Sequence, residues 1–245
     1  MSLRDCIMVA VSLAFERHFL WAVRWPVFSV TSFLMVSRLV REGVRPATVI
    51  DVGANIGQFG VACAKLFPNA VVHSFEPIPE CFRRLQRVAL RVPNLVPHNV
   101  ALSDRSGEVD FHVNAHSQSS SVLCLNERHL SAFPKARAVR TIRVGASTLD
   151  EEFASQVLAE PILLKLDVQG YEANVLRGGR RLLRQVEFIV CETSFQPLYE
   201  GELPFLELAA LIEDSGFRFL RPVGFLRDPR SGEYLQMDAL FVRGR

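Results

Sequence analysis

The amino-acid sequence predicts an α/β protein built on one mostly parallel β-sheet. From residue 46 onward, short apolar strand-like segments alternate with helix-like segments, which is the pattern of parallel strands joined by crossover helices. A stretch containing glycines, DVGANIGQFG at residues 51–60, joins the first of these strands to the first helix. The last two apolar segments lie close together across a turn rich in Gly, Asp and Pro, so we expect an antiparallel hairpin at the end of the chain.

The first half of this pattern supplies strands and helices in strict alternation. We expect them at residues 48–53, 56–67, 70–76, 79–91 and 95–102, starting with a strand. Pro68 and Asn69 end the first helix, and a proline opens the second.

The alternation of strands and helices is interrupted in the middle of the chain. EVDFHV at residues 108–113 alternates apolar and polar side chains, which predicts a half-exposed strand. We expect it to pair with VRTIRV at residues 139–144, across a polar excursion at residues 114–137. Thr148 and Glu151 have the spacing of a capping box at the start of a short helix.

The second half returns to strands and helices. PILLKLD at residues 161–167 predicts a buried strand, followed by another crossover helix. Further strands are expected at residues 186–192, 217–222 and 235–242, with a helix at residues 203–214.

The composition is that of one globular domain. The chain has 245 residues, of which 49% are hydrophobic and 22% charged, and this length suffices for one substantial core. The net charge is only +2 and no basic stripe is visible, so no nucleic-acid partner is expected. The cysteines are odd in number, widely spaced and without a C-x-x-C pair, which is typical of reduced thiols and predicts a cytoplasmic protein.

The N-terminal residues 1–44 are predicted to form a helical extension or lid ahead of a main domain at residues 45–245. The extension is apolar, but its uncharged run at residues 25–37 is bounded by Arg24 and Arg38, whereas a membrane-spanning helix needs about 20 apolar residues. No small-x-small cleavage site follows the apolar stretch. We therefore favour helices packed on the main domain over a transmembrane, secretory or peripheral membrane role.

Polar residues follow the predicted strands at the point where each strand ends. In an open α/β sheet, ligands bind at the carboxyl ends of the strands, so these residues are candidates for a site. They are Asp51, Glu76, Asn99, Asp167 and Glu192. The plainer alternative is that such residues only cap backbone groups in loops.

The first loop discriminates between two cofactor classes. It lacks the middle glycine of a G-x-G-x-x-G dinucleotide loop, because Asn55 stands between Gly53 and Gly57. A pyrophosphate bound at the following helix would be repelled by Asp51, whereas this carboxylate would attract the cationic groups of S-adenosylmethionine. Glu76 is placed to accept hydrogen bonds from a ribose diol, a feature of both classes.

Several motifs together resemble the FkbM family of S-adenosylmethionine-dependent methyltransferases. They are VIDVGANIGQF, SFEPIP, NVALSD, STLDE and LLKLDVQGYEANVLRGG, and the resemblance extends from about residue 47 to residue 243. The resemblance implies a Rossmann-like, seven-stranded class I methyltransferase sheet with an antiparallel last strand. It also implies methyl transfer to a hydroxyl, typically of a sugar, a glycan or a polyketide-like metabolite.

The resemblance assigns cofactor contacts residue by residue. In the first loop and at the next two strand ends it places Asp51, Gly53, Ala54, Asn55, Gly57, Glu76, Pro77, Asn99 and Ala101. For Asn99, a loop residue that bonds nearby backbone is an equal alternative.

The segment KLDVQGYE is the second candidate for chemistry. Alternation along the strand puts Lys165 and Asp167 on one face, so they are expected to be neighbours. Glu172 begins the next helix, where the helix dipole stabilises a carboxylate. Asp167 is predicted to lie beside the methyl-transfer centre, where it would orient the cofactor or accept the hydroxyl proton.

Methyl transfer to a hydroxyl needs a proton acceptor. The candidates are Asp167, Glu192, Glu172 and His116, which lies in the polar excursion, and Asp167 is favoured. His112 and His116 do not share a helical face, so no metal site is expected.

Two other functions remain open at this point. One is an oxidoreductase or nucleotide-sugar enzyme that uses NAD(P), and the other is a non-catalytic protein that keeps the fold. The missing central glycine and Asp51 count against the first, and the intact cofactor positions count against the second.

Overall fold

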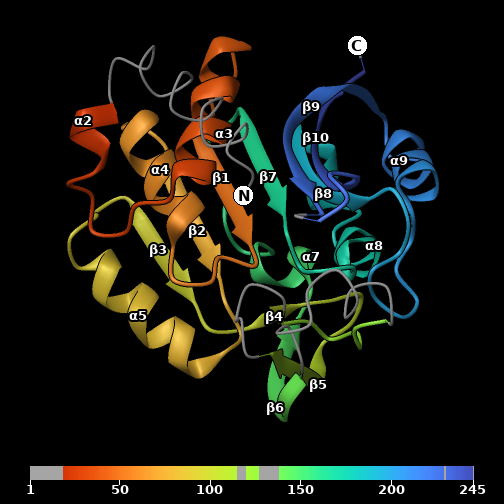
Figure 1. Cartoon of the computed structure of the whole chain (residues 1–245). Helices are drawn as coiled ribbons and strands as arrows, with labels where there is room; N and C mark the ends of the chain where they lie inside the picture. Colours follow the sequence, from red (N-terminus) through yellow and green to blue (C-terminus); the bar gives the residue numbers. More distant parts are fainter. Residues whose placement is uncertain (1–18, 115–119, 127–137, 229, 245) are drawn as a thin grey trace.

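The computed structural model describes residues 19–114, 120–126, 138–228 and 230–244. A seven-stranded sheet forms its centre (Figure 1). Its strands are, in spatial order, β3 (Leu95–His98), β2 (Val71–Phe75), β1 (Thr48–Val52), β7 (Ile162–Leu166), β8 (Val186–Ser194), β10 (Tyr234–Arg243) and β9 (Phe217–Arg227). The pairs from β3 to β8 are parallel, and β10 runs antiparallel to both β8 and β9. The predicted sheet with an antiparallel last strand is confirmed.

Helices cover both faces of this sheet. The helices α2 (Phe19–Ala22), α3 (Val30–Arg41), α4 (Gln58–Leu66) and α5 (Pro79–Ala89) contribute to one hydrophobic cluster. The opposite face carries α7 (Leu149–Glu152), α8 (Glu172–Arg177), the 3₁₀ turn η2 (Leu182–Arg184) and α9 (Phe205–Asp214). Successive residues of β1 enter the two clusters in turn, with Val49 on the first side and Ile50 on the second. Because both faces are buried, the central strands are continuously apolar.

A smaller sheet stands beside the carboxyl ends of the main strands. It consists of β4 (Ala101–Leu102), β6 (Ala138–Ser147) and β5 (Gly107–Asn114). The predicted pairing of the two middle strands is confirmed, since β5 and β6 are antiparallel, with Val109 opposite Val144 and Phe111 opposite Ile142.

Several predicted element boundaries are wrong: the last hairpin's first strand, expected at residues 217–222, continues to Arg227, and the helix expected at residues 203–214 begins at Phe205. Two further differences have a clear cause. The single strand expected at residues 95–102 is two strands in different sheets, because the chain turns at Asn99, whose side-chain amide donates to the backbone oxygens of Glu76 and Pro77. The helix expected from residue 56 begins at Gln58, because Asn55 and Gly57 have positive φ angles of 50° and 97° and keep the loop out of helical geometry.

The N-terminal helix α3 packs into the main core. Phe33, Val36 and Leu39 are fully buried in the cluster that also contains β-sheet residues, and Arg38 donates a hydrogen bond to the backbone oxygen of Val223 in β9. The division of the chain near residue 44 stays a prediction. Within the described residues, no helix has the length and hydropathy needed to cross a bilayer.

Candidate functional site

The candidate site lies where β1, β2, β7 and β8 end, beside the smaller sheet (Figure 1). The parallel register places Asp51 of β1 beside Ser74 of β2 and Lys165 of β7. Asp167 follows β7, and Glu192 lies within the longer β8. The strand-end residues picked out in the sequence therefore face a common edge of the sheet.

The loop after β1 needs glycine for two separate reasons. Gly53 has a φ of +85°, and a Cβ atom there would lie 1.9 Å from the backbone oxygen of Asp167. Gly57 has a φ of +97°, and a Cβ atom there would approach the Leu85 side chain to 2.8 Å. The absence of side chains thus lets the cofactor loop pack directly on the turn that carries Asp167 and on α5.

Backbone N–H groups of this loop already have partners within the chain. Five consecutive groups donate hydrogen bonds: Gly53 and Ala54 to the Phe75 oxygen, Asn55 to Glu76 Oε2, Ile56 to its neighbour Asn55 Oδ1, and Gly57 to the Ala54 oxygen. A pyrophosphate in a dinucleotide site is held by such N–H groups. Residues 53–57 therefore offer it no free backbone N–H group in this arrangement.

Glu76 holds the loop in place. Its Oε2 accepts from the Asn55 N–H and its Oε1 from the Ile78 N–H, both at 2.8 Å. Glu76 is only 4% exposed. Burial raises the pKa of its carboxyl group to about 7, although the two hydrogen bonds act to lower this pKa. Each oxygen keeps a lone pair, so the carboxylate can accept further hydrogen bonds.

The next residues shape the border with the smaller sheet. Pro77 and Asn99 meet through the Asn99 amide, which donates to the Pro77 oxygen at 3.2 Å. Ala101 is buried in β4, in a cluster that includes Ile78. Asn99 thus makes the backbone contacts that were its alternative role, while its predicted place near an adenine stays a prediction.

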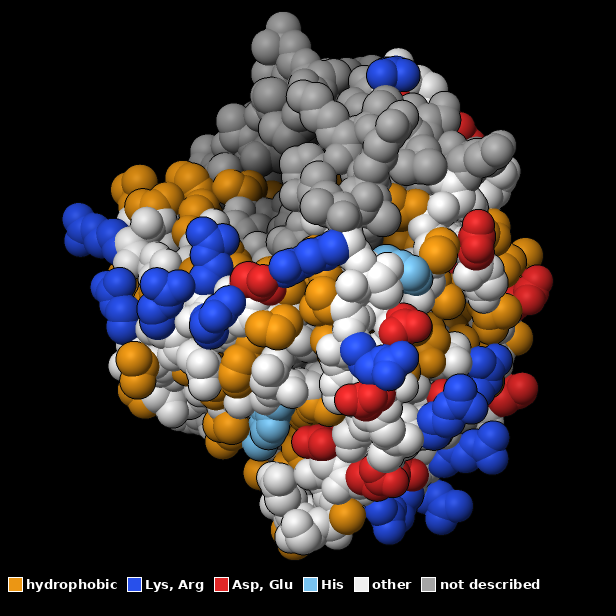
Figure 2. Space-filling model, turned by 90° about the horizontal axis from the view of Figure 1, so that it is seen from below, with side chains coloured by type: hydrophobic (Ala, Val, Ile, Leu, Met, Phe, Trp, Pro, Cys, Tyr) orange, Lys and Arg blue, Asp and Glu red, His pale blue; other side chains and the backbone are white. Residues whose placement is uncertain are grey.

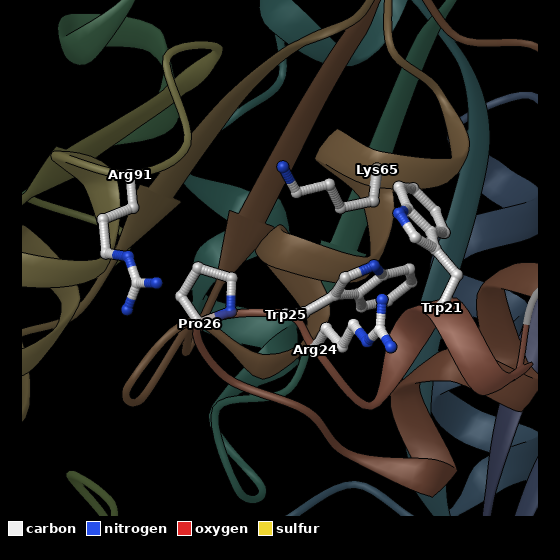
Figure 3. Close-up of a pocket in the computed structure, with 6 residues that line it drawn as sticks. All are labelled: Trp21, Arg24, Trp25, Pro26, Lys65 and Arg91. Carbon is white, nitrogen blue, oxygen red and sulfur yellow. The ribbon is translucent and has the colours of Figure 1, made fainter.

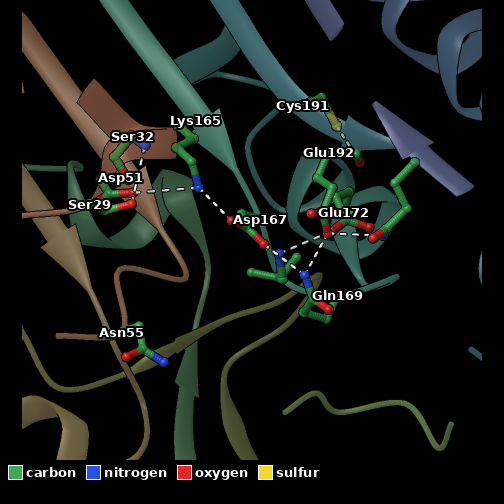
Figure 4. Close-up of polar contacts among 12 residues, drawn as sticks. Ser29, Ser32, Asp51, Asn55, Lys165, Asp167, Gln169, Glu172, Cys191 and Glu192 are labelled. Atoms are coloured by element: carbon green, nitrogen blue, oxygen red, sulfur yellow. Dashed lines mark hydrogen bonds and ion pairs between the residues drawn. The ribbon is translucent and has the colours of Figure 1, made fainter. Parts of the chain in front are cut away.

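Lys165 lies between two carboxylates, as Figure 4 shows. Its Nζ is 2.8 Å from Asp167 Oδ2 and 4.0 Å from Asp51 Oδ1, which confirms that Lys165 and Asp167 are neighbours. Burial alone would lower the pKa of Lys165, but the two carboxylates outweigh it and raise this pKa above its usual range.

Asp51 is fully buried rather than open to a ligand. Its Oδ2 accepts from the Ser74 hydroxyl at 3.2 Å, while its Oδ1 has no hydrogen-bond partner among the described residues. Burial raises the pKa of Asp51 to about 6, and the nearby Lys165 opposes this rise. Since the negative charge of Asp51 is partly balanced within the protein, its proposed attraction for a cationic ligand is weaker than the sequence alone indicates.

Asp167 is connected to Glu192 through Gln169. The Gln169 amide donates to Asp167 Oδ1 at 2.9 Å and also to Glu192 Oε2, and Gln236 donates to the same Glu192 oxygen at 3.1 Å. Burial first, and the neighbouring carboxylates of Asp167 and Asp238 next, raise the pKa of Glu192 well above its usual value. The network places the Asp167 and Glu192 carboxyl groups together at one edge of the sheet.

Sequence reasoning missed three members of this network. Gln236 and Asp238 project from β10, and the register places Asp238 opposite Glu192. Gln169 has a φ of 58°, and its amide oxygen accepts from the Tyr199 hydroxyl. The signal available in the sequence was the pair of polar residues in LQMDAL, two positions apart in an otherwise apolar strand.

Glu172 serves the turn between β7 and α8. Its Oε1 accepts from the N–H groups of Val168 at 3.0 Å and Gly170 at 3.3 Å. It begins α8, as predicted. Glu172 is only 2% exposed, and burial raises the pKa of its carboxyl group to about 8. This carboxyl supports the Asp167 turn and is poorly placed to meet a substrate.

Part of the polar excursion covers the same turn. The Ser121 hydroxyl hydrogen-bonds to the backbone oxygens of Val168 at 3.1 Å and Gln169 at 2.8 Å. Farther along, Leu125 forms a bridge with Tyr199. Residues 120–126 therefore link the smaller sheet to the loop after β8, next to the candidate site.

Only some of the six histidines belong to the residues that the structure describes. His116, proposed above as a proton acceptor, lies outside the described residues. His73 and His98 face each other at 3.1 Å, and burial lowers the pKa of His73 to about 4. Within the described part of the chain, no group of three His, Cys, Asp or Glu side chains is arranged to hold a metal ion.

Comparison with known proteins identifies the family. Residues 51–219 match the family model of the methyltransferase FkbM domain. The chain is 29% identical to the 2-O-methyltransferase NoeI of Sinorhizobium fredii, over 80% of this chain and 82% of that protein. It is 30% identical to the hexuronic acid methyltransferase AglP of Haloferax volcanii, over 64% of this chain and 60% of that protein.

A third relative is the 31-O-demethyl-FK506 methyltransferase FkbM of Streptomyces tacrolimicus. It is 30% identical over 57% of this chain and 63% of its own length. The match with the family model covers the ends of β1, β2, β7 and β8 and the loops that follow them, but not Gln236 and Asp238 of β10. The chain therefore belongs to the FkbM methyltransferase family and has the class I methyltransferase fold.

Proposed function

We propose that this protein transfers a methyl group from S-adenosylmethionine to a hydroxyl group of a sugar, a glycan or a polyketide-like metabolite. The observation that carries the proposal is the loop after β1, which is closed against Asp167 and supported by Glu76. The names of the relatives support an oxygen acceptor, because two of them specify O-methylation and another a hexuronic acid.

The residues at the strand ends fit an adenosine-bearing methyl donor. The glycine loop would lie under it, and Glu76 would accept from the ribose diol with the lone pairs that its two backbone bonds leave unused. The direct contacts we assign to it are Gly53, Ala54, Asn55, Gly57, Glu76, Pro77, Asn99, Ala101 and Asp167. Asp51 was predicted as a further contact, but it is fully buried, so we assign it an influence on the donor through its charge only. When bound, the donor supplies an electrophilic methyl group.

Asp167 is our candidate for the proton acceptor. Its side chain is 31% exposed, whereas that of Lys165 is 4% exposed, so of this pair Asp167 is the one that a substrate can reach. Lys165 and Gln169 each donate to a different Asp167 oxygen and orient the carboxylate. With the donor bound and its methyl group directed at the acceptor hydroxyl, Asp167 would accept the proton that this hydroxyl gives up.

Glu192 is the second candidate for this proton. Gln169 joins its carboxyl group to Asp167, and burial with the neighbouring carboxylates raises the pKa of Glu192 well above its usual value, so its ionised form is more basic than an ordinary glutamate. The same role for His116 stays a prediction.

The alternative of an NAD(P)-dependent enzyme has less support. The backbone N–H groups at residues 53–57 donate within the chain, so none of these groups is left free for a pyrophosphate. The family match also favours methyl transfer over an NAD(P)-dependent reaction.

Calorimetric titration with S-adenosylhomocysteine and with NAD tests the donor. We expect S-adenosylhomocysteine to bind to the protein and NAD not to bind. Glu76→Ala should weaken binding at least about tenfold, which corresponds to about 1.4 kcal/mol. Glu80→Ala is the matched control, because Glu80 is a nearby exposed carboxylate paired with Arg140. Binding of NAD without S-adenosylhomocysteine would overturn the proposal.

A second experiment tests the proton acceptor. Asp167→Asn should lower methyl transfer about 10²- to 10⁴-fold and leave a measurable affinity for S-adenosylhomocysteine. Acceptors to try are hexuronic acids, other sugars and hydroxylated macrolactones, with the product identified by mass spectrometry. Full activity of Asp167→Asn, with Glu192→Gln inactive, would move the role to Glu192.

A further inference from the structure

A surface far from the candidate site combines exposed apolar side chains with positive charge. It is formed by α2, the turn that follows α2, and the carboxyl ends of α4 and α5, and we call it the α2–α5 surface. Its defining residues are Leu20, Trp21, Val23, Arg24, Lys65, Leu90 and Arg91. The ends of α4 and α5 that contribute to it point away from the carboxyl ends of the strands (Figure 1).

The apolar side chains of this surface are unusually open. Leu20 is 81% exposed, Trp21 48%, Val23 49% and Leu90 87%. Single exposed apolar residues are common on proteins, but here three of the four come from one short helix and the turn beside it. A group of this kind, which includes a tryptophan, is typical of a contact with a partner or a membrane interface.

Positive side chains surround this apolar group. Trp21, Arg24, Trp25, Pro26, Lys65 and Arg91 line a pocket of about 340 Å³. Figure 3 shows the Lys65 ammonium and the Arg91 guanidinium approaching the space beside Pro26 from two sides, with the Trp25 indole near it and the Trp21 indole farther away, beyond Trp25. Among the described residues, no Asp or Glu lines this pocket.

The positive charge continues along α5. Arg83, Arg84 and Arg87 are exposed on its outer face, and Arg83, Gln86, Arg87 and Leu90 line a neighbouring hollow. In Figure 2, Lys and Arg side chains gather on the side of the molecule where α5 lies, with few acidic side chains among them. This concentration is notable because the whole chain has a net charge of only +2.

We propose that the α2–α5 surface docks on the headgroup region of an anionic lipid bilayer. Trp and Leu side chains enter the interface between headgroups and acyl chains, while Arg and Lys bind lipid phosphates. Charge complementarity selects this occupant, since a neutral apolar partner would leave the positive side chains of the pocket unpaired. Because the surface lies at the opposite ends of α4 and α5 from the cofactor loop, docking leaves the methyl-transfer site uncovered.

Co-sedimentation of the full-length protein with vesicles tests this proposal without any methyl acceptor. Vesicles of phosphatidylcholine with about one third phosphatidylglycerol should bind the protein, and binding should fall steeply with added salt. Pure phosphatidylcholine vesicles should bind it far more weakly. The triple variant Arg24→Gln, Lys65→Gln, Arg91→Gln should bind on the order of 100-fold more weakly, at about fivefold for each lost cation.

Matched controls separate docking from misfolding and from loss of net charge. The control triple variant Arg177→Gln, Arg180→Gln, Arg184→Gln removes the same charge from exposed side chains elsewhere and should bind vesicles like the wild type. Trp21→Ser tests the apolar part and should also reduce binding. All variants should keep the thermal stability and the S-adenosylhomocysteine affinity of the wild type, so a failure here is distinct from a failure of the proposed function.

Three results would overturn the proposal. One is the absence of binding to anionic vesicles by the wild-type protein. Another is equal loss of binding in the two triple variants, which would reduce the effect to net charge. The third is concentration-dependent self-association that Trp21→Ser abolishes while vesicle binding persists, because the surface would then contact a second copy of the chain.

Discussion

At the residue scale, the candidate site depends on one backbone contact that no side chain could tolerate. The Gly53 backbone approaches the Asp167 backbone so closely that a Cβ atom would lie 1.9 Å from the Asp167 oxygen. This contact joins the predicted cofactor loop to the predicted proton acceptor. A shift of either segment should therefore displace the other.

Gly53→Ala should damage both stability and ligand binding. The positive φ angle costs about 1–2 kcal/mol for a residue with a Cβ atom, and the overlap with Asp167 adds about 1–3 kcal/mol. Gly43→Ala is a matched control, because Gly43 has a similar φ of +81° and nothing within 4 Å of the added atom. Urea unfolding should show the larger loss for Gly53→Ala. Equal losses would mean that the contact with Asp167 relaxes without cost.

Lys165 is the second decisive residue. Its ammonium is the positive charge within reach of both Asp51 and Asp167, and removing one member of a buried charged group typically costs about 3–5 kcal/mol. We expect a loss of this size for Lys165→Met. Adding Asp51→Asn should restore part of the stability, because the neutral amide no longer needs a counter-charge. A double-mutant cycle from urea unfolding measures this coupling, and strict additivity would contradict it.

At the element scale, the strands and helices follow from local sequence patterns, while their ends follow from loop contacts. The short helix α7 illustrates both. The Thr148 hydroxyl accepts from the Glu151 N–H at 3.1 Å, as the capping signal predicts. The Glu151 carboxylate itself accepts from the Ser106 hydroxyl, and so connects α7 to the turn before β5.

Loss of the Thr148 cap should cost about 1 kcal/mol in the free energy of unfolding. Thr148→Ala removes the side-chain acceptor, whereas Thr148→Ser keeps it and should retain most of the stability. Chemical denaturation of the two variants and the wild type measures the difference. Equal stability of all three would show that the cap contributes nothing in this buried setting.

At the scale of the whole molecule, several carboxyl groups are buried near one sheet edge. Burial, the largest cause in each case, raises the pKa to about 6 for Asp51 and Asp238, about 7 for Glu76 and about 8 for Glu172. Between their unfolded and folded pKa values, the folded state binds protons that the unfolded state releases. Stability therefore falls as the pH rises through this window.

Glu172→Gln should make this pH dependence shallower. The amide oxygen can still accept from Val168 and Gly170, but the group no longer titrates. Between about pH 5.5 and about pH 7.5, the free energy of unfolding should fall less steeply, by up to about 1.4 kcal/mol per pH unit. Urea unfolding at several pH values measures the slope. The control Glu213→Gln, on the exposed face of α9, should leave it unchanged, and an unchanged slope in Glu172→Gln would refute the assignment.

The amino-acid sequence alone is enough to predict the order of the elements, the parallel sheet with its antiparallel last strand, and the family. These properties depend on alternation of apolar residues and on short motifs, which are local in the chain. For the same reason Lys165 and Asp167 were recognised as neighbours, because they are two residues apart on one strand. The prediction of a single strand at residues 95–102 was wrong because its two halves pair with different, distant strands.

The environment of each charged group, in contrast, follows from the tertiary structure. Asp51 looked like a carboxylate available to a ligand, but Lys165 and Ser74 from neighbouring strands enclose it. Gln236 and Asp238 joined the site from β10, which lies far along the chain from the cofactor loop. Burial and charge pairing depend on which strands become neighbours, and this information is contained in long-range packing rather than in any local stretch of sequence.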